Sequence, residues 1–396
     1  MRRPLDIART LAPVAATLLI AVLPARASAQ SLFAEQGLGL VSEPQSARST
    51  GLGGVSLGLA GYEITWSNPA GAVGLPAAGL LVSTQVDGFK ARYGGHEATG
   101  TTNRFPLVMA AFPFGEKWAL TAGFGSFLDQ RWAIENQDTL LIGGDSLGVT
   151  DRVSSDGGVS RLRLGAGYQI VPHLSIGVGM DLYTGGTTRV IGRIFPGEAS
   201  PACCTSRWEY AGTGALASLD WTPNAALRVS VSGSAGGTLK AKPTTGDKTG
   251  AERSYELPAT VSVGASGRVA ANALVAASAG WSGWSSLDPA LATSGGARDI
   301  WSAHGGIEWD ALSLLGRPLP VRIGGRYQGL PFRMEGATTD TPFSSERAFS
   351  FGTGIILGGG ATRTDLSVER GHRGELAQGL DESFWRINFS VSVLGQ

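Results

Sequence analysis

The sequence predicts an all-β protein: a transmembrane antiparallel β-barrel of about fourteen strands, with an N-terminal segment folded into its lumen. Two patterns carry this prediction. Many short segments alternate apolar with polar or glycine residues, and short connections alternate with long ones along the chain. No stretch after residue 30 reaches the 18 apolar residues typical of a membrane helix.

The composition agrees with this fold class and excludes others. Of 396 residues, 59 are glycine, and only 16% are charged. A hydrophobic content of 42% with zero net charge argues against a disordered chain. A nucleic-acid binder is not expected, because such proteins carry a clustered positive excess.

Residues 1–29 are typical of a secretory signal peptide. Arg2 and Arg3 precede an apolar stretch from Leu11 to Leu23, and Ala27-Ser28-Ala29 forms a cleavage site. An uncleaved amphipathic anchor is the alternative. We therefore expect the mature chain to lie outside the inner membrane, in the bacterial outer membrane.

Period-two alternation is clearest in 161–170, 174–183 and 385–393. Successive side chains of a strand face opposite sides, so each segment has one apolar face. The other predicted strands are 79–86, 104–113, 117–127, 207–221, 226–235, 257–268, 273–284, 300–310, 319–328, 346–357 and 362–370. Of these, 207–221 and 273–284 alternate poorly.

The connections have their own pattern. Very short turns follow 113, 170, 221, 268 and 357, and the turn 311–318 is somewhat longer. Long polar links occupy 87–103, 128–158, 184–206, 236–256, 285–299, 329–345 and 371–381. Outer-membrane barrels alternate short periplasmic turns with long extracellular loops in this way.

The apolar face of the strands is expected to face lipid, because only helices and closed barrels can span a bilayer. Aromatic residues near strand ends would then form interfacial girdles. We assign Trp118, Tyr168, Trp208, Trp301, Trp309, Tyr327 and Trp385 to them. A large soluble β-protein core is the alternative.

Residues 30–78 do not alternate and are dominated by Gly, Ala, Ser and Leu. The segment is too long for an ordinary linker and too apolar for a solvated tail. Inward glycines on the strands, such as Gly165 and Gly177, would leave room for it. We expect a compact hatch at 30–78 inside a barrel formed by 79–396. A periplasmic extension that caps the barrel is the alternative.

The stretch from Ser49 to Gly58, followed by Asn68-Pro69-Ala70, resembles the N-terminal hatch of the FadL-type long-chain fatty-acid transporters. Leu257-Pro258-Ala259-Thr260 to Trp281-Ser282-Gly283-Trp284 is similar to a late region of such barrels. The chain ends in Val393-Leu394-Gly395-Gln396, whereas many outer-membrane barrels end in an aromatic residue.

The resemblance implies a monomeric fourteen-stranded barrel that lets small hydrophobic molecules, such as long-chain fatty acids or hydrocarbons, cross passively. A sibling group with the same hatch, the PorV-like proteins, implies a different role, that of a docking or shuttle component in protein secretion. The expected partners are therefore hydrophobic molecules and outer-membrane lipid, or else a secretion-system protein.

An apolar solute that leaves sideways needs a break in strand pairing. Glycine within a strand marks bulges and bends, so Gly123-Phe124-Gly125 is the predicted exit. The hatch residues expected at the ligand are Trp66, Asn68, Pro69 and Ala70. The link from Leu128 to Asp156, which contains Trp132, is the expected outer capture surface.

Charged residues on inward strand faces are expected to meet in the lumen. They are Arg161, Arg163, Asp181, Arg322, Arg326, Asp365, Glu369 and Arg386. One interpretation is an ion-pair network that holds the hatch and stiffens the wall. The other is that some of the arginines bind a ligand carboxylate.

No catalytic, metal or cofactor site is predicted, so an enzyme is not expected. Gly54-Val55-Ser56-Leu57-Gly58 matches G-x-S-x-G, but it lies in the hatch glycine run instead of a strand–turn–helix. His304 and Glu308 share an inward strand face and are expected to form a hydrogen-bonded pair. Cys203 and Cys204 are adjacent, and whether they are bonded is left open.

Overall fold

The computed structural model describes residues 31–93, 96–143, 145–197, 204–245, 251–291, 296–314, 316–333, 342–375 and 379–395. The expected signal peptide and Cys203 lie outside these ranges. Cys204 is disulfide-bonded. In this part of the chain, no helix has the length and apolar character needed to cross a membrane.

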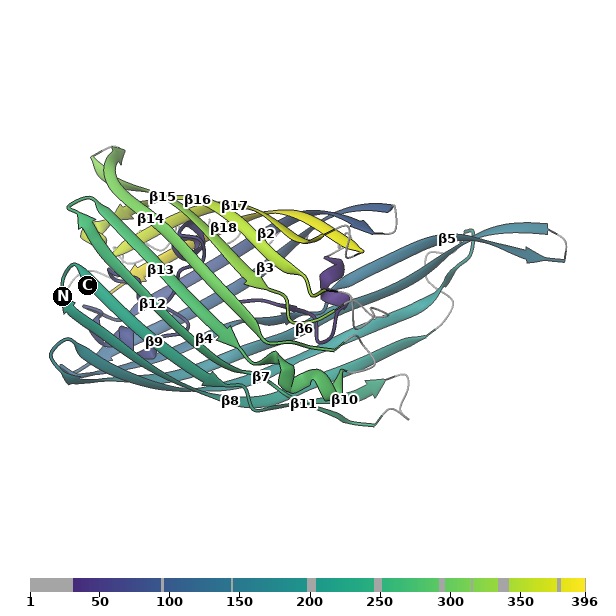
Figure 1. The fold of residues 1–396 in the computed structure, drawn as a ribbon, viewed down its shortest axis with the longest axis horizontal. Coiled ribbons are helices and arrows are strands. Elements are labelled where there is room, and N and C mark those ends of the chain that lie inside the picture. The colour runs from purple at the N-terminus through teal and green to yellow at the C-terminus, as the bar shows by residue number, and fades with distance from the viewer. Residues whose placement is uncertain are drawn as a thin grey trace, which may run out of the picture.

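Fourteen of the described strands form a closed antiparallel barrel (Figure 1). They are β2 (Gly79–Tyr93), β3 (His96–Phe114), β4 (Trp118–Asp129), β6 (Asp145–Val171), β7 (Leu174–Ile194), β8 (Thr205–Asn224), β9 (Leu227–Ala235), β12 (Ala259–Ala270), β13 (Ala273–Ser282), β14 (Ile300–Leu314), β15 (Arg317–Gly329), β16 (Ser345–Leu357), β17 (Thr362–Glu375) and β18 (Leu380–Leu394). Each pairs with the next, and β18 pairs with β2 from Gly79 to Tyr93, which closes the ring. The predicted fold class is confirmed.

All fourteen predicted segments overlap these strands in order, but several strands are much longer. The strand predicted at 161–170 is β6, which begins at Asp145. The added residues lie at the end of the barrel that carries the long connections, where the strands run on past the predicted segments (Figure 1). There the outward faces are more polar, so the apolar alternation that revealed the strand cores is lost.

The predicted long links contain further structure. β5 (Trp132–Ile142) pairs with the first part of β6, and this hairpin projects far beyond the rim (Figure 1). β10 (Thr238–Thr245) pairs with β8 and with β11 (Arg253–Glu256). The short 3-10 helices η3 (Trp284–Ala290) and η5 (Gly358–Gly360) complete the connections.

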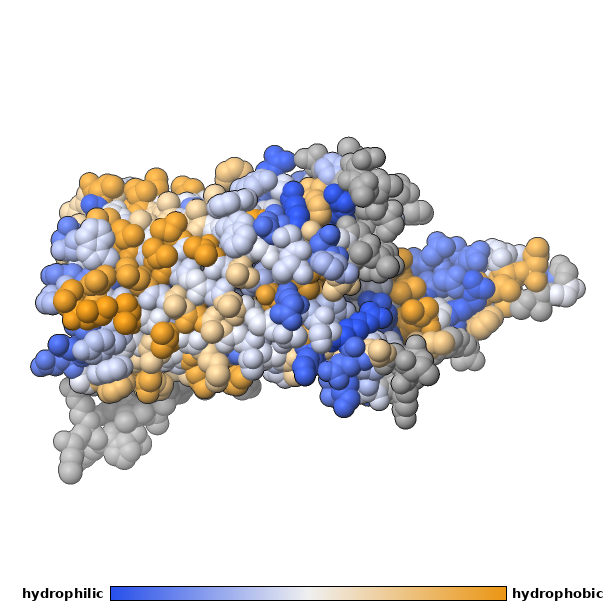
Figure 2. Space-filling model, turned by 60° about the horizontal axis from the view of Figure 1, so that its bottom comes forward, coloured by the Kyte–Doolittle hydropathy of each residue, from blue (hydrophilic) through white to orange (hydrophobic). Residues whose placement is uncertain are grey.

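The outward face of the barrel carries the apolar belt of a membrane protein. Figure 2 shows hydrophobic residues gathered toward the end with the short turns, with more hydrophilic residues toward the other end. Val178 and Ile323 are 60% and 63% exposed there. The tilted rings of Trp118 and Tyr168 pack together near the short-turn end, with their centroids 4.5 Å apart. This pattern places the barrel in the outer membrane.

One predicted girdle residue was assigned to the wrong face. Trp208 lies on the inward face of β8, where it lines a cavity and packs against the interior apolar cluster. The poor alternation of 207–221 hid this orientation. Trp221, on the same strand, is 44% exposed and takes the outward position near the short turns.

Residues 31–78, called the hatch below, contact the inward faces of the strands. The hatch contains η1 (Leu32–Glu35), the two-residue strand β1 (Leu40–Val41), the helix α2 (Ala47–Gly51) and η2 (Pro69–Gly74). Ser46 caps α2 by accepting a hydrogen bond from the Ser49 amide, and Asn68 caps η2 through Gly71. Pro69 at the first position of η2 suits a helix start.

Inward glycines let the hatch backbone approach the wall. A Cβ atom added at Gly177 would lie 2.4 Å from the Ala70 nitrogen, and one at Gly324 would lie 2.1 Å from the Gly53 nitrogen. Real Cβ atoms do not approach backbone this closely. The Asn68-Pro69-Ala70 tripeptide and the hatch glycine run are therefore each seated on strand glycines.

Candidate transport pathway

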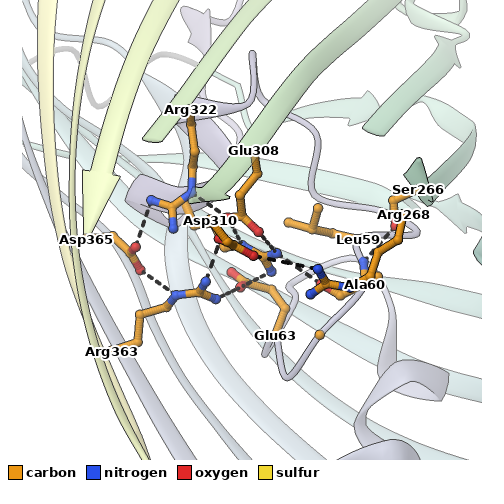
Figure 3. Close-up of polar contacts among 12 residues, drawn as sticks. Leu59, Ala60, Glu63, Ser266, Arg268, Glu308, Asp310, Arg322, Arg363 and Asp365 are labelled. Carbon is orange, nitrogen blue, oxygen red and sulfur yellow. Dashed lines mark hydrogen bonds and ion pairs between the residues drawn. The ribbon is translucent and has the colours of Figure 1, made fainter. Parts of the chain in front are cut away.

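A buried ion-pair cluster fixes α2 to the wall (Figure 3). Arg48 binds Glu63 of the hatch at 3.1 Å and Glu308 of β14 at 2.7 Å. Arg322 of β15 joins Glu308 at 2.6 Å, and Arg322 also binds Asp365 of β17 at 2.9 Å. Because these groups are almost fully buried, removal of one partner would leave an uncompensated charge.

A second anchor holds η2. The Asn68 side chain donates to Asp220 at 2.9 Å and to Ser230 at 3.2 Å. Arg228 binds Asp220 at 2.9 Å and donates to the backbone oxygens of Leu59 and Gly71. The hatch is therefore attached at two separate places toward the short-turn end of the lumen.

The predicted lumen residues Arg163 and Asp181 form a bidentate pair, with both N–O distances at 2.6 Å. Arg163 also donates to the backbone oxygen of Trp66. Arg161 reaches the same carboxylate only at 3.7 Å, and its guanidinium lies between the rings of Trp66 and Phe127, about 5 Å from each. Two cations thus share one carboxylate.

The other predicted lumen arginines have carboxylate partners. Arg322 binds Glu308 and Asp365, as described above. Arg326 binds Glu346 and Glu369, the latter at 2.9 Å. Arg386 binds Glu369 at 2.7 Å and Asp87 at 3.2 Å. Glu308 was predicted to face inward, but with a different partner, His304. Glu346 and Asp87 were not singled out from the sequence, although inward-facing parity along their strands could have identified them.

The expected pair of His304 and Glu308 does not form. His304 forms a hydrogen bond of 2.9 Å with the backbone oxygen of Gly53. The Glu308 carboxylate instead accepts hydrogen bonds from Arg48 and Arg322. Four residues along a strand span about 13 Å, which is too far for direct contact. Each side chain instead reaches the part of the hatch that lies opposite it.

A cavity of about 130 Å³, the lumen cavity, lies beside the hatch. Its apolar walls are Trp66, Phe127, Tyr183, Leu216 and Trp284, and its polar lining includes several serines with Arg161 and Glu43. A second cavity of about 310 Å³ lies closer to the long connections, lined by Trp132, Trp208, Tyr255 and Arg189 among others. Of the predicted capture segment, Trp132 therefore contributes to an interior cavity.

The wall is interrupted between β3 and β4. Among the described residue pairs, their ladder ends at Leu107 and Gly125, although both strands continue. Pro106 has no backbone N–H to donate and stands where the pairing stops. On the other edge of β4, the register with β6 shifts between Ser126 and Leu128, so Phe127 is an extra, bulged residue.

Beyond this bulge, β4 pairs with the hatch in place of β3. Leu40 is opposite Asp129 and Val41 is opposite Leu128, and the Ser42 amide donates to the Phe127 oxygen at 2.9 Å. One ion pair bridges the two separated strands, between Arg104 of β3 and Asp129 of β4 at 2.6 Å.

The predicted break at Gly123-Phe124-Gly125 is therefore displaced. All three residues keep regular partners on β3 and β6. Glycine keeps both backbone hydrogen-bonding groups, so it does not itself end a ladder. Gly123 has a different role, because a Cβ there would lie 2.9 Å from the Trp66 ring.

A side notch of about 280 Å³ occupies the interruption. Its lining comes from β3, β4 and β6 and includes Asn103, Ser126, Leu128 and Ser160. Ser126 is eight residues along β4 from Trp118, which corresponds to about 20 Å of height for a strand tilted by about 40°. The apolar belt of such barrels is about 25 Å tall, so the notch faces its outer part.

Comparison with known proteins agrees with this architecture. Residues 7–191 match the protein-family model described as BamG. No curated protein sequence matches the chain. Among solved structures, a FadL homologue of Pseudomonas aeruginosa superposes with a TM-score of 0.62 at 12% identity, covering 90% of this chain and 99% of that one.

Two channels for aromatic compounds are also similar. The toluene transporter TodX of Pseudomonas putida has a TM-score of 0.55 at 16% identity, covering 88% of this chain and 98% of its own. The monoaromatic hydrocarbon channel CymD has a TM-score of 0.53 at 15% identity, with coverages of 91% and 99%. The chain thus has the fold of the FadL-type outer-membrane transporters.

Proposed function

We propose that the protein is a monomeric, non-enzymatic outer-membrane channel for the passive uptake of small hydrophobic molecules, which leave the lumen sideways into the bilayer. The observation that carries the proposal is the interrupted wall between β3 and β4, next to an aromatic-lined lumen cavity. The similarity to a toluene transporter and to a monoaromatic hydrocarbon channel supports the same class of cargo.

The route has three parts. A solute enters the cavity lined by Trp132, Trp208 and Tyr255 on the side of the long connections. It passes to the lumen cavity, where Trp66 and Phe127 offer apolar ring surfaces. Phe127 stands between Ser126 and Leu128, which line the side notch, so rotation of its ring would join the lumen cavity to the notch.

The hatch has the complementary task of closing the straight path to the periplasm. Its buried ion pairs to β14 and its hydrogen bonds to β8 and β9 hold it in the lumen. Water-soluble solutes are excluded, whereas an apolar solute gains free energy by moving from the notch into lipid.

The volume of the lumen cavity favours small solutes. At about 130 Å³, it is close to the roughly 150 Å³ of an apolar cavity known to hold benzene. We therefore propose ring-sized hydrocarbons as better cargo than long-chain fatty acids, which would have to extend along the whole route.

Blocking the notch tests the proposal. Ser126→Trp puts an indole into the side notch without touching the hatch anchors. We expect uptake of radiolabelled toluene by cells producing this variant to fall at least about tenfold. The matched control is Ala122→Trp, on the same outward face of β4 where pairing with β3 and β6 is intact. It should keep uptake within about twofold.

Equal uptake by both variants and the unmodified protein would overturn the lateral route. If the unmodified protein gives no uptake above cells that lack it, and purifies with a bound protein partner, the docking role in secretion replaces the proposed channel. Heat-modifiable migration on gels shows that each variant barrel is folded.

A further inference from the structure

The lumen cavity has two walls of different chemistry. One is aromatic and includes Trp66 of the hatch, Phe127 of β4 and Tyr183 of β7. The other comes from β9, β12, β13 and β14, farther round the ring. Neighbours in sequence such as Val231 and Val261 face outward and are exposed, so strand alternation directs the hydroxyls of this wall into the lumen. We call them the hydroxyl wall: Ser232, Ser234, Thr260, Ser262, Ser282 and Ser302.

Sheet register brings three of these residues together around one glycine. Ser232 of β9 pairs with Ser262 of β12. Gly280 of β13 pairs with Ser262 on one side and with Ser302 of β14 on the other. A Cβ atom added at Gly280 would lie 2.9 Å from the Ser262 hydroxyl oxygen and 3.0 Å from that of Ser302. The two hydroxyls therefore converge on the space above Gly280, which the missing side chain leaves open.

Most of the hydroxyl wall has no protein partner. Ser234 and Thr260 form a hydrogen bond with each other at 2.7 Å. Four hydroxyls make no hydrogen bond within the described part of the chain, namely those of Ser232, Ser262, Ser282 and Ser302. Ser232 is only 6% exposed, so its free hydroxyl is enclosed where it lines the cavity. Because buried polar groups are nearly always hydrogen-bonded, such a set of free hydroxyls indicates that water or a ligand bonds them.

Free hydroxyls in a cavity discriminate between solutes. In a polar cavity they are bonded by water. A hydrocarbon that displaces this water leaves the hydroxyls unpaired, which costs free energy. A solute that carries its own hydroxyl restores the bonds, because a hydroxyl both donates and accepts, as serine does. A site of this kind rejects an analogue that lacks the matching group.

A negatively charged solute fits the cavity less well. Arg161 and Arg163 both stand on β6 and share the carboxylate of Asp181, so they are not part of the hydroxyl wall. Glu43 of the hatch adds a negative charge to the lining. The hydroxyl wall thus favours an uncharged group that can donate and accept a hydrogen bond.

We propose that the lumen cavity selects uncharged rings that carry a hydroxyl group, such as phenols, over bare hydrocarbons of the same size. The ring packs against Trp66 and Phe127, while its hydroxyl bonds to Ser262 and Ser302 above Gly280. A volume of about 130 Å³ suits one ring. The proposal rests on the proposed function, because it takes the lumen cavity as a stop on the route to the side notch. A phenol keeps enough apolar surface to continue from there into lipid.

The test compares 4-fluorophenol with 4-fluorotoluene, two probes of similar shape that differ by a hydroxyl in place of a methyl group. Binding to the full-length protein in mild detergent is measured by fluorine NMR over a titration, with empty micelles as the blank. The unmodified protein should bind 4-fluorophenol more tightly. Ser262→Ala combined with Ser302→Ala should weaken binding of 4-fluorophenol about tenfold, through the loss of two hydrogen bonds, without weakening binding of 4-fluorotoluene.

The matched control is Ser83→Ala combined with Ser367→Ala. These two buried serines face inward on β2 and β17 and also lack hydrogen-bond partners, but they do not line the lumen cavity. Their loss should change neither affinity.

Three results would overturn the proposal. They are binding of 4-fluorotoluene by the unmodified protein that is as tight as that of 4-fluorophenol, an absence of 4-fluorophenol binding above the micelle blank, and an equal loss of both probes in the Ser262→Ala, Ser302→Ala variant. Each of them leaves the lateral route standing, because blocking the side notch is tested separately by uptake of toluene into cells.

Discussion

The two sides of the barrel wall are closed by different means. On the β14–β18 side the strands stay paired on both sides of one register shift, between Trp309 and Leu312, and a buried ion pair joins Arg48 of the hatch to Glu308. On the β3–β4 side the ladder stops, and the two-residue strand β1 and one ion pair take its place. Buried pairs are costly to break, whereas short segments with few contacts open locally. The proposed lateral route depends on this contrast, because it requires the β3–β4 side to open while the hatch stays in place.

The largest effect is expected at the hatch anchor. Arg48→Ala would remove the cation that binds Glu63 and Glu308 most closely. Arg322 would still bind Glu308, and Arg363 would remain at 3.8 Å from Glu63 and 3.7 Å from Glu308. We expect the free energy of unfolding to fall by about 3–5 kcal/mol. Urea titration followed by tryptophan fluorescence measures this change, and single-channel recording should show a new ionic conductance.

The control for this anchor is Arg268→Ala. Arg268 is exposed and reaches Asp310 only at 3.7 Å, so its loss should cost at most about 1 kcal/mol. Equal destabilisation by the two variants would mean that the buried cluster does not hold the hatch.

The next effect is expected where the hatch meets β4. Gly123→Val introduces a side chain into the space of the Trp66 ring, and overpacking of this kind costs about 1–3 kcal/mol. Displacement of Trp66 should also narrow the lumen cavity and slow uptake several-fold. Gly88→Val is the matched control, because a Cβ at Gly88 meets only Thr101, at 3.9 Å. If Gly123→Val leaves toluene uptake unchanged, Trp66 does not line the route that the solute takes.

A smaller effect is expected at the bridge across the interruption. Arg104→Gln removes the ion pair to Asp129, but Asp129 keeps Arg131 at 2.9 Å. We expect a loss of about 1–2 kcal/mol in stability and faster uptake, because the separated strands lose their direct link. Uptake of isotopically light toluene by cells with the variant, compared with uptake of heavy toluene by cells with the unmodified protein, would measure this increase in uptake rate. Slower uptake in a folded variant would contradict a bridging role.

The smallest effect is expected in the projecting β5–β6 hairpin. A hydrogen bond from Arg193 holds the pKa of Asp151 below its ordinary value. The Arg193–Asp151 pair therefore contributes its full stabilisation when the pH is above the ordinary pKa of an aspartate. This stabilisation is lost as the pH falls through the lowered pKa of Asp151. Amide hydrogen exchange in β5 should be unchanged between pH 7 and pH 5 after correction for intrinsic rates, and the protection should fall at more acidic pH. Asp151→Asn should abolish that dependence.

Strand alternation made the barrel predictable, because a lipid-facing residue must be apolar at every second position. The same rule correctly placed Arg163, Asp181 and Arg322 on the inward face, since a charge cannot face lipid at mid-height. It failed for Trp208, which lies beyond the apolar belt, where an aromatic residue can face either way.

The interruption of the wall was harder to find. Gly123 and Gly125 were chosen because glycine favours bends. The last described pair of the ladder is Leu107 with Gly125, next to Pro106, and the missing amide hydrogen of a proline can be read from the sequence. The bulge at Phe127 and the pairing of β1 with β4 depend on contacts between distant segments, which local patterns do not encode. The partners of Arg48 are likewise set by how the hatch is seated in the lumen.

The most direct test of lateral exit follows a solute through the protein. A toluene analogue carrying a photoreactive diazirine is added to cells producing the channel, and cross-linked residues are identified by mass spectrometry after brief irradiation. The account predicts labels at Trp66 and Phe127 and then at the notch residues Asn103, Ser126 and Ser160. Labels on η2 and the short turns, with none at the notch, would show that solutes pass through the hatch and would contradict it.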